Sequence, residues 1–243
     1  MRICRWLSFA TLGALLLSTG LCSHAGAYHR TPLTEPSGTN LPTELLTNSP
    51  LKRISQDVFA LGEVRLDKAK GTVSFPCSVN MAEGVVEYAI VHSTGKVHES
   101  VLKTEADPFH IHLAALLLSP KQPGALPAGM PRELAGPPIR IWVTWKVQET
   151  EHRVRLETLV SNVMTRASMT AGPWIYNGSR VVEGTFLAHR DGSIVSVISD
   201  PDALINNPRP GRDDDEIWRS NLGIVPGKGT AVEVTLELPN GHF

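Results

Sequence analysis

The chain has 243 residues, 42% of them hydrophobic and 19% charged, with a formal net charge of −1. This balance is typical of a globular protein, and the length is ample for one sizeable core. The sequence has no cluster of Lys and Arg of the kind that binds nucleic acid, so we expect no nucleic-acid partner.

The first 27 residues have the pattern of a signal peptide. Arg2 and Arg5 precede an apolar run of 12 residues, Trp6 to Leu17, and Ala25-Gly26-Ala27 has the small-x-small pattern of a signal peptidase site. The run is shorter than the roughly 20 residues that cross a bilayer as a helix. We therefore expect cleavage after Ala27, no stable membrane span, and a periplasmic or otherwise exported protein.

The cysteines bear on export in two ways. Cys22 offers a minor alternative, attachment of lipid, although a lipoprotein signal has a small residue before its cysteine and here that residue is Leu21. Cleavage after Ala27 leaves Cys77 alone, so no internal disulfide is expected. It also removes two of the 23 basic residues, so 21 remain against 24 acidic ones and the mature net charge is −3. Cys77 lies within a predicted apolar strand and has no adjacent base, which favours a buried structural thiol.

Residues 28–50 are rich in Pro, Thr and Ser, as in a linker or disordered lead-in, so the folded domain is expected over 51–243. Four strands are then predicted from runs of β-branched residues that end in Gly, Lys or Asn. Their ranges are 58–66, 71–79, 85–92 and 98–103. Ser93-Thr94-Gly95-Lys96 predicts a hairpin turn between the last two.

Asp107-Pro108 predicts the start of a helix, because Asp caps a helix and Pro is tolerated at its first position. Apolar residues follow as far as Leu118, so this helix is expected to pack against the sheet. Residues 120–138 hold six prolines and three glycines and predict a long loop. A loop of this length is either mobile or functional.

Residues Ile139–Val147 alternate strictly between the two faces of a strand, which predicts one face in the core and one mostly exposed to solvent. The apolar residues of 156–165 recur at helical spacing and predict a second, amphipathic helix. Further strands are predicted at 174–177, 181–189, 193–199 and 231–238, with a hairpin turn at Arg190-Asp191-Gly192. The expected fold class is α+β, a single domain of mainly antiparallel β-sheet with two helices packed on it.

The order of these signals resembles the YdjY-like domain of exported bacterial proteins. The resemblance covers roughly residues 58–238, and the segments that carry it are FPCSVN, EYAIV, KVHESVL, IHLAALLL, IRIWVTW, WIYNGS and DPDALIN. It implies export, a single domain and a bacterial origin. It implies no established activity and supplies no catalytic residues.

We expect no metal and no cofactor. His110 and His112 diverge by about 200° on a helix, so they cannot share an ion without further ligands. The acidic segments Asp200–Asp202 and Asp213–Glu216 lack the spacing of a calcium-binding EF-hand loop. Asp200 is instead expected to cap a helical turn at 203–205.

His98 and Glu99 are the candidate catalytic residues. As neighbours on a predicted strand they point to opposite faces, so they do not form a contiguous pair. A glutamate buried among apolar neighbours has a raised pKa and can act as a general acid. The alternative is structural, with Glu99 paired to Lys96 or Lys103 at the rim of the hairpin.

Two functions remain open from the sequence, and whether the protein is an enzyme is uncertain. The favoured hypothesis is a non-enzymatic module that binds an envelope protein or a small ligand through the loop at 120–138 and an exposed aromatic residue, Trp142. The alternative is a metal-assisted or acid–base hydrolase whose site gathers His98 and Glu99 with other histidines. Those candidates are His92, His152 and His189.

Overall fold

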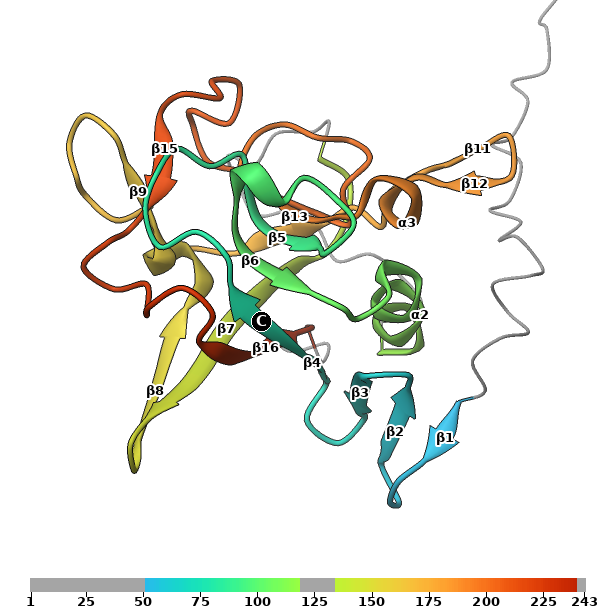
Figure 1. Ribbon diagram of the computed structural model, residues 1–243. Coiled ribbons are helices and arrows are strands. Elements are labelled where there is room, and N and C mark those ends of the chain that lie inside the picture. Colours follow the sequence, from blue (N-terminus) through green and yellow to red (C-terminus); the bar gives the residue numbers. More distant parts are fainter. Residues whose placement is uncertain (1–50, 119–133, 240–243) are drawn as a thin grey trace, which may run out of the picture. The chain divides into compact units, whose positions relative to one another are not determined.

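Eight strands pair in a ring and form a closed β-barrel (Figure 1). The computed structural model describes residues 51–118 and 134–239, so the predicted signal peptide, the linker 28–50 and most of the loop 120–138 lie outside the described residues. In spatial order the barrel strands are β4 (Thr72–Val79), β16 (Ala231–Glu237), β7 (Pro138–Val147), β10 (Trp174–Tyr176), β14 (Ile205–Asn206), β13 (Ser193–Ser196), β5 (Tyr88–His92) and β6 (Ser100–Thr104).

Strand β4 closes the ring because it divides one of its edges between two partners. Its first residues pair with β3 (Val64–Asp67), and its last residues, Ser78 and Val79, pair with β6. Strand β16 takes the other edge along the full length of β4. The hairpin of β2 (Val58–Leu61) and β3, with the short β1 (Lys52–Arg53), therefore continues the sheet outside the barrel.

The predicted fold class, a mainly antiparallel sheet with two packed helices, is wrong. The ring is mixed, since β13 pairs with β14 and β5 with β6 in parallel. The helices of the described residues are short: α2 (Pro108–Leu118) and α3 (Leu187–Asp191), with single 3-10 turns at η1 (Val97–Glu99) and η2 (Leu156–Leu159). Alternation indicates that a segment is a strand but does not reveal its partner, so closure was not visible in the sequence.

The predicted hairpin at 93–96 is also wrong. Residues 93–99 carry the chain back to the start of β5, where Glu87 N–H donates to Glu99 O at 2.9 Å, and Tyr88 then pairs with Ser100. Parallel neighbours usually need a connection of a dozen residues or more. Here seven suffice because β5 is only five residues long.

The helix predicted over 156–165 is wrong as well. Leu156 and Leu159 are buried from one 3-10 turn, in which residues three apart share a face, and β9 (Val160–Asn162) follows directly. The Asn162 side chain then accepts the N–H groups of Met164 and Thr165 at 2.9 and 3.0 Å, which ends the strand in a turn. β9 pairs with β15 (Trp218–Ser220) in a separate small sheet.

The strand predicted over 181–189 divides into three elements. β11 (Val181–Val182) and β12 (Thr185–Phe186) form a tight hairpin whose two turn residues, Glu183 and Gly184, both have positive φ. Helix α3 follows, so the hairpin turn expected at 190–192 is instead the end of a helix. Gly192 terminates α3 in the left-handed conformation.

Several predicted elements are confirmed, among them helix α2 and strand β7. Helix α2 begins where Asp107 Oδ1 accepts the Phe109 N–H at 2.8 Å, and it packs against β3 and β4. In β7 the predicted alternation buries the side chains from Ile139 to Trp145 on one face, although Val147 at the strand end is 51% exposed.

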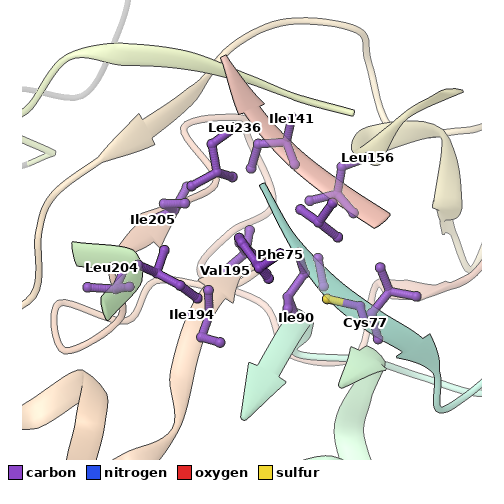
Figure 2. Packing of buried hydrophobic residues seen from close by; sticks show 14 of the residues in the cluster. Phe75, Cys77, Ile90, Ile141, Leu156, Ile194, Val195, Leu204, Ile205 and Leu236 are labelled. Carbon is purple, nitrogen blue, oxygen red and sulfur yellow. The ribbon is translucent and has the colours of Figure 1, made fainter. Parts of the chain in front are cut away.

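Apolar side chains from all eight strands fill the barrel. Figure 2 shows Phe75, Ile90, Ile141, Val195 and Leu236 lying together in this core. Each such side chain contributes about 1.5–3 kcal/mol to folding through its burial. No helix in the described ranges is long and apolar enough to cross a membrane.

Candidate functional site: a polar pocket beside strands β10 and β14

A pocket of about 330 Å³ opens where the segment after β10 meets the turn before β14. This volume lies at the lower end of the range for small-ligand sites. The antiparallel pairing of Ile175 with Asn206 and Tyr176 with Ile205 brings the two segments together. The lining residues are Leu134, Ala135, Asn177, Ser179, Arg180, Ser199, Asp200, Pro201, Asn206 and Arg212.

Asn206 holds the turn that carries Asp200. The fully buried Asn206 amide accepts the Asp200 N–H at 3.0 Å and donates to the Asp200 carbonyl at 2.8 Å. The Asp200 carboxylate in turn accepts the N–H of Asp202 at 2.9 Å. The helical turn predicted at 203–205 is therefore wrong: Asp200 closes a side-chain turn, and Ile205 already belongs to β14.

The opposite wall is held by two further polar contacts. Ser179 Oγ donates to the Asp202 carbonyl at 2.5 Å and accepts the Ala188 N–H at 3.0 Å. Arg180 forms an ion pair with the carboxylate of Asp202, with Nε donating at 2.7 Å and Nη2 bonding the same oxygen. Both sides of the pocket are thus fixed to the same short turn.

Asn177 and Arg212 complete the polar lining. Asn177 Nδ2 donates to the Ala135 carbonyl at 3.1 Å, while its Oδ1 is buried and meets no donor among the described residues. The Arg212 side chain is 14% exposed, and its Nε donates to Ser199 Oγ at 3.1 Å. The lining therefore combines two guanidinium groups, one carboxylate and uncharged polar groups.

A chain of polar contacts leads from the pocket to one of the predicted catalytic residues. Tyr88 Oη donates to Asp200 Oδ2 at 2.9 Å and accepts from Lys96 Nζ at 2.8 Å, and Lys96 Nζ also lies 3.8 Å from Glu99 Oε1. Burial raises the pKa of Tyr88 to about 12, so the phenol keeps its proton. Burial alone lowers the pKa of Lys96, but the bond to Tyr88 and the charge of Glu99 outweigh it and raise that pKa.

His98 and Glu99 lie on η1 rather than on the predicted strand. The His98 side chain is 77% exposed, and its Nε2 is 3.4 Å from Glu99 Oε2. The pairing of Glu99 with Lys96, expected from a structural role, is confirmed. Burial and the charge of Glu99 raise the pKa of the neighbouring Glu87. A catalytic role for His98 or Glu99 stays a prediction.

The other histidines named for a hydrolase site have separate partners. His92 Nδ1 bonds Thr94 Oγ1 at 2.8 Å, and His189 Nδ1 lies 2.8 Å from the Asp107 carboxylate that caps α2. His152 stacks on Trp145 with ring centroids 5.3 Å apart. None of these contacts is to His98 or Glu99.

His110 and His112 diverge on α2, as the helical spacing predicts. His112 is buried, and its Nδ1 lies 2.6 Å from the hydroxyl of Tyr176, the last residue of β10. Burial lowers the pKa of His112 to about 4 and raises the pKa of Tyr176. Gly178, next to the pocket residues Asn177 and Ser179, lies against the ring of His112. This pair therefore lies next to the segment that carries two residues of the pocket wall.

Trp142 is half-buried rather than exposed and has partners within the fold, and a binding role for it stays a prediction. Its Nε1 donates to Glu237 Oε2 at 2.9 Å, and the guanidinium groups of Arg153 and Arg155 lie 4.2 and 5.2 Å from its ring centroid. Such cation–π contacts each contribute about 0.5–1 kcal/mol at exposed sites.

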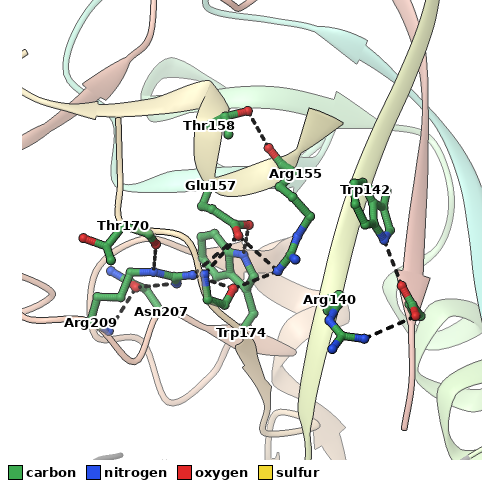
Figure 3. A network of polar contacts seen from close by, with 11 residues as sticks. Arg140, Trp142, Arg155, Glu157, Thr158, Thr170, Trp174, Asn207 and Arg209 are labelled. Carbon is green, nitrogen blue, oxygen red and sulfur yellow. Dashed lines mark hydrogen bonds and ion pairs between the residues drawn. The ribbon is translucent and has the colours of Figure 1, made fainter. Parts of the chain in front are cut away.

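A buried charge network lies between η2, the loop before β10 and the loop after β14 (Figure 3). The fully buried Glu157 accepts from Arg155 Nη2 at 3.0 Å and from Trp174 Nε1 at 3.2 Å. Arg209 Nη2 lies 3.9 Å from the same carboxylate and donates to the Gly172 carbonyl at 2.7 Å. Burial lowers the pKa of Arg209 to about 10, although Glu157 opposes that shift.

Sequence reasoning missed Glu157 and Arg209 because they lie far apart in the chain and belong to no motif. Their network holds loops together and exposes no reactive group, so we assign it a structural role.

Cys77 is 6% exposed, which confirms the buried thiol, and burial raises its pKa. Within residues 51–118 and 134–239, no three His, Cys, Asp or Glu side chains gather closely enough to hold a metal ion. Ser199 Oγ donates to Asp213 at 2.7 Å, which ties one residue of the acidic run to the pocket wall.

Comparison with known proteins supports the resemblance noted in the sequence. No curated protein and no solved structure matched the chain. The family model described as the YdjY domain matches residues 64–237, which is most of the chain and includes every strand of the barrel up to Glu237. The pocket at β10 and β14 lies within the matched region, and two of the segments that carry the resemblance, WIYNGS and DPDALIN, form its walls. The chain therefore belongs to the YdjY domain family.

Proposed function

We propose that the protein is an exported, non-enzymatic binding module whose small polar ligand occupies the pocket at β10 and β14. The observation that carries this proposal is the pocket of about 330 Å³, whose walls are held by contacts within the protein. Asp200, Asn206 and Ser179 all have hydrogen-bond partners, so little side-chain ordering accompanies binding. Preorganisation of this kind favours affinity.

The mixed charge of the lining favours a polar ligand. Arg180, Arg212 and Asp200 place both signs of charge around the opening, and Leu134 and Pro201 add apolar surface. A ligand with hydroxyl, amide or charged groups fits this lining better than a purely apolar one.

A ligand screen with a blocked pocket tests the proposal. The full chain is screened by thermal shift against amino acids, sugars, carboxylates and short peptides, and positive compounds are measured by calorimetry. Ala135→Trp places a large side chain at the exposed rim and is expected to abolish binding. Ala167→Trp, on an exposed turn elsewhere, is the matched control and is expected to leave it unchanged. Binding that survives in Ala135→Trp would place the ligand elsewhere.

Export is part of the proposal and has its own test. The mature N-terminus of protein recovered from the cell envelope is expected at Tyr28, after cleavage behind Ala27. An N-terminal Cys22 carrying lipid would support the lipoprotein alternative. A chain that begins at Met1 in the envelope would contradict both.

A hydrolase remains the second candidate, favoured by the polar chain from Asp200 through Tyr88 and Lys96 to Glu99. Ester, peptide and phosphate substrates are tested with the wild type, His98→Ala and Glu99→Gln. Turnover lost in both variants, without loss of folding, would support this candidate over the binding module.

A further inference from the structure

We infer that strand β8 (Thr150–Arg155) is a self-pairing edge, through which two copies of the chain join their sheets in antiparallel fashion about His152. In the described part of the chain β8 pairs only with β7, and its residues from Thr150 to Arg153 are exposed. The hairpin of β7 and β8 extends away from the barrel (Figure 1), so a second copy can approach this edge. An edge strand with free backbone groups is a template for another strand.

The hairpin geometry determines which backbone groups face outward. Val147 pairs with Thr150 around a two-residue turn, and Trp145 pairs with His152. The pair that flanks such a turn exchanges both hydrogen bonds, and bonded and non-bonded pairs then alternate along the ladder. The N–H and C=O groups of Glu151 and Arg153 therefore point away from β7.

The charges select one register. Residues 149 to 155 read ETEHRVR, with glutamates at the odd positions of the first half and arginines at the odd positions of the second. Pairing about His152 sets Glu151 opposite Arg153 of the other copy, twice by symmetry. Shifting the axis to 151 or 153 still leaves two opposite pairs, Glu149 with Arg153 or Glu151 with Arg155, but it also sets two glutamates or two arginines directly against each other at the axis, whereas the axis at His152 has no like pair. Opposite charges across strands stabilise, and like charges destabilise.

The backbone and the charges therefore agree on the same register. Residues whose backbone N–H and C=O groups point away from β7 must pair with residues of the same kind in the other copy. The axis at His152 satisfies this condition for Glu151 and Arg153 in both copies. The two-fold arrangement is also the commonest symmetry of homo-oligomers.

A charge-swap experiment with the full chain tests the inference by analytical ultracentrifugation. The wild type is expected to dimerise with concentration, whereas Glu151→Arg alone and Arg153→Glu alone each bring like charges together and weaken the dimer about tenfold or more. An equimolar mixture of the two variants restores both opposite pairs, so a heterodimer is expected. Glu63→Arg, an exposed charge change on another turn, is the control and is expected to dimerise as the wild type does.

Three results would overturn the inference. These are a wild type that stays monomeric at every concentration, a dimer that both single variants retain, and a mixture that fails to recover association although each variant folds. Arg153→Glu also removes a cation–π contact to Trp142, whereas Glu151→Arg does not. The variant Glu151→Arg therefore separates the effect on pairing from an effect on folding.

Discussion

The hydroxyl of Tyr88 donates to Asp200 Oδ2 at 2.9 Å and thereby joins barrel strand β5 to the turn that lines the pocket. The two residues are 112 positions apart in the chain, and the pairing of β5 with β13 brings them together. The contact couples the candidate site to the rigid barrel. Together with burial, which is the larger cause, the contact raises the pKa of Tyr88, because the negative carboxylate disfavours loss of the phenol proton.

The first prediction concerns this bond. Tyr88→Phe removes the donor to Asp200 and the acceptor for Lys96, and we expect the free energy of unfolding to fall by about 1–3 kcal/mol. Urea denaturation measures this loss. In a double-mutant cycle with Asp200→Ala the two losses are expected to be less than additive, because both variants break the same contact. Strictly additive losses would show that the contact contributes nothing.

The second prediction concerns Gly178, which lies between the pocket residues Asn177 and Ser179. A Cβ at Gly178 would lie 3.2 Å from His112 Cε1, and the residue has a φ of +79°. Gly184 has almost the same φ, +78°, but has nothing within 4 Å of its Cβ position. We expect Gly184→Ala to cost about 1–2 kcal/mol from its backbone conformation alone. Gly178→Ala is expected to cost about 1–3 kcal/mol more through overpacking. Equal losses in thermal or urea unfolding would mean that the His112 ring moves aside freely.

Elements that rest on local chemistry were predictable from the sequence. The cap of Asp107 and the proline after it identified helix α2, and the alternation from Ile139 to Trp145 identified the buried face of β7. In both cases one short segment contains the whole signal. Neighbouring residues alone decide whether such a helix or strand forms.

The features that the sequence did not predict depend on contacts between segments that lie far apart in the chain. Leu156 and Leu159 are three apart, a spacing that suits an α-helix and a 3-10 turn equally, and the pairing of β9 with β15 decided the outcome. The pocket was missed for the same reason. Asn177 and Asp200 belong to different segments, and only the pairing of β10 with β14 makes them neighbours.

The third prediction concerns pH. Because His112 has a folded pKa of about 4, below its ordinary value of 6.5, the unfolded chain takes up the proton first as the pH falls. Stability is therefore complete above pH 6.5 and declines as the pH falls toward 4, by about 3 kcal/mol in total from this group. The titratable group that faces His112 is Tyr176, whose raised pKa keeps it neutral throughout this window. Urea midpoints between pH 4 and 7 measure the slope.

Variants assign that slope to one residue. His112→Gln has no group that titrates and is expected to flatten the dependence on pH, whereas His98→Gln, at an exposed position, is expected to leave it unchanged. A slope that persists in His112→Gln would transfer the effect to other groups.

The fourth prediction concerns the buried charge network. Glu157→Gln keeps the shape of the side chain but removes the negative charge that lies near Arg155 and Arg209. Two guanidinium groups then remain without their counter-charge. Removing one member of a buried ion pair costs about 3–5 kcal/mol, and we expect a loss of that size in urea denaturation.

Glu237→Gln is the matched control for Glu157→Gln, because it makes the same chemical change at a carboxylate that also bonds a tryptophan and pairs with an arginine. Glu237 accepts from Trp142 and lies 3.4 Å from Arg140, but its side chain is 37% exposed. Water can solvate the charges that remain, so the expected loss is about 1–2 kcal/mol or less. Burial is then the main difference between the two variants. If both lose the same amount of stability, the network at Glu157 is no stronger than a surface pair, and its role in holding η2 and the two loops together is contradicted.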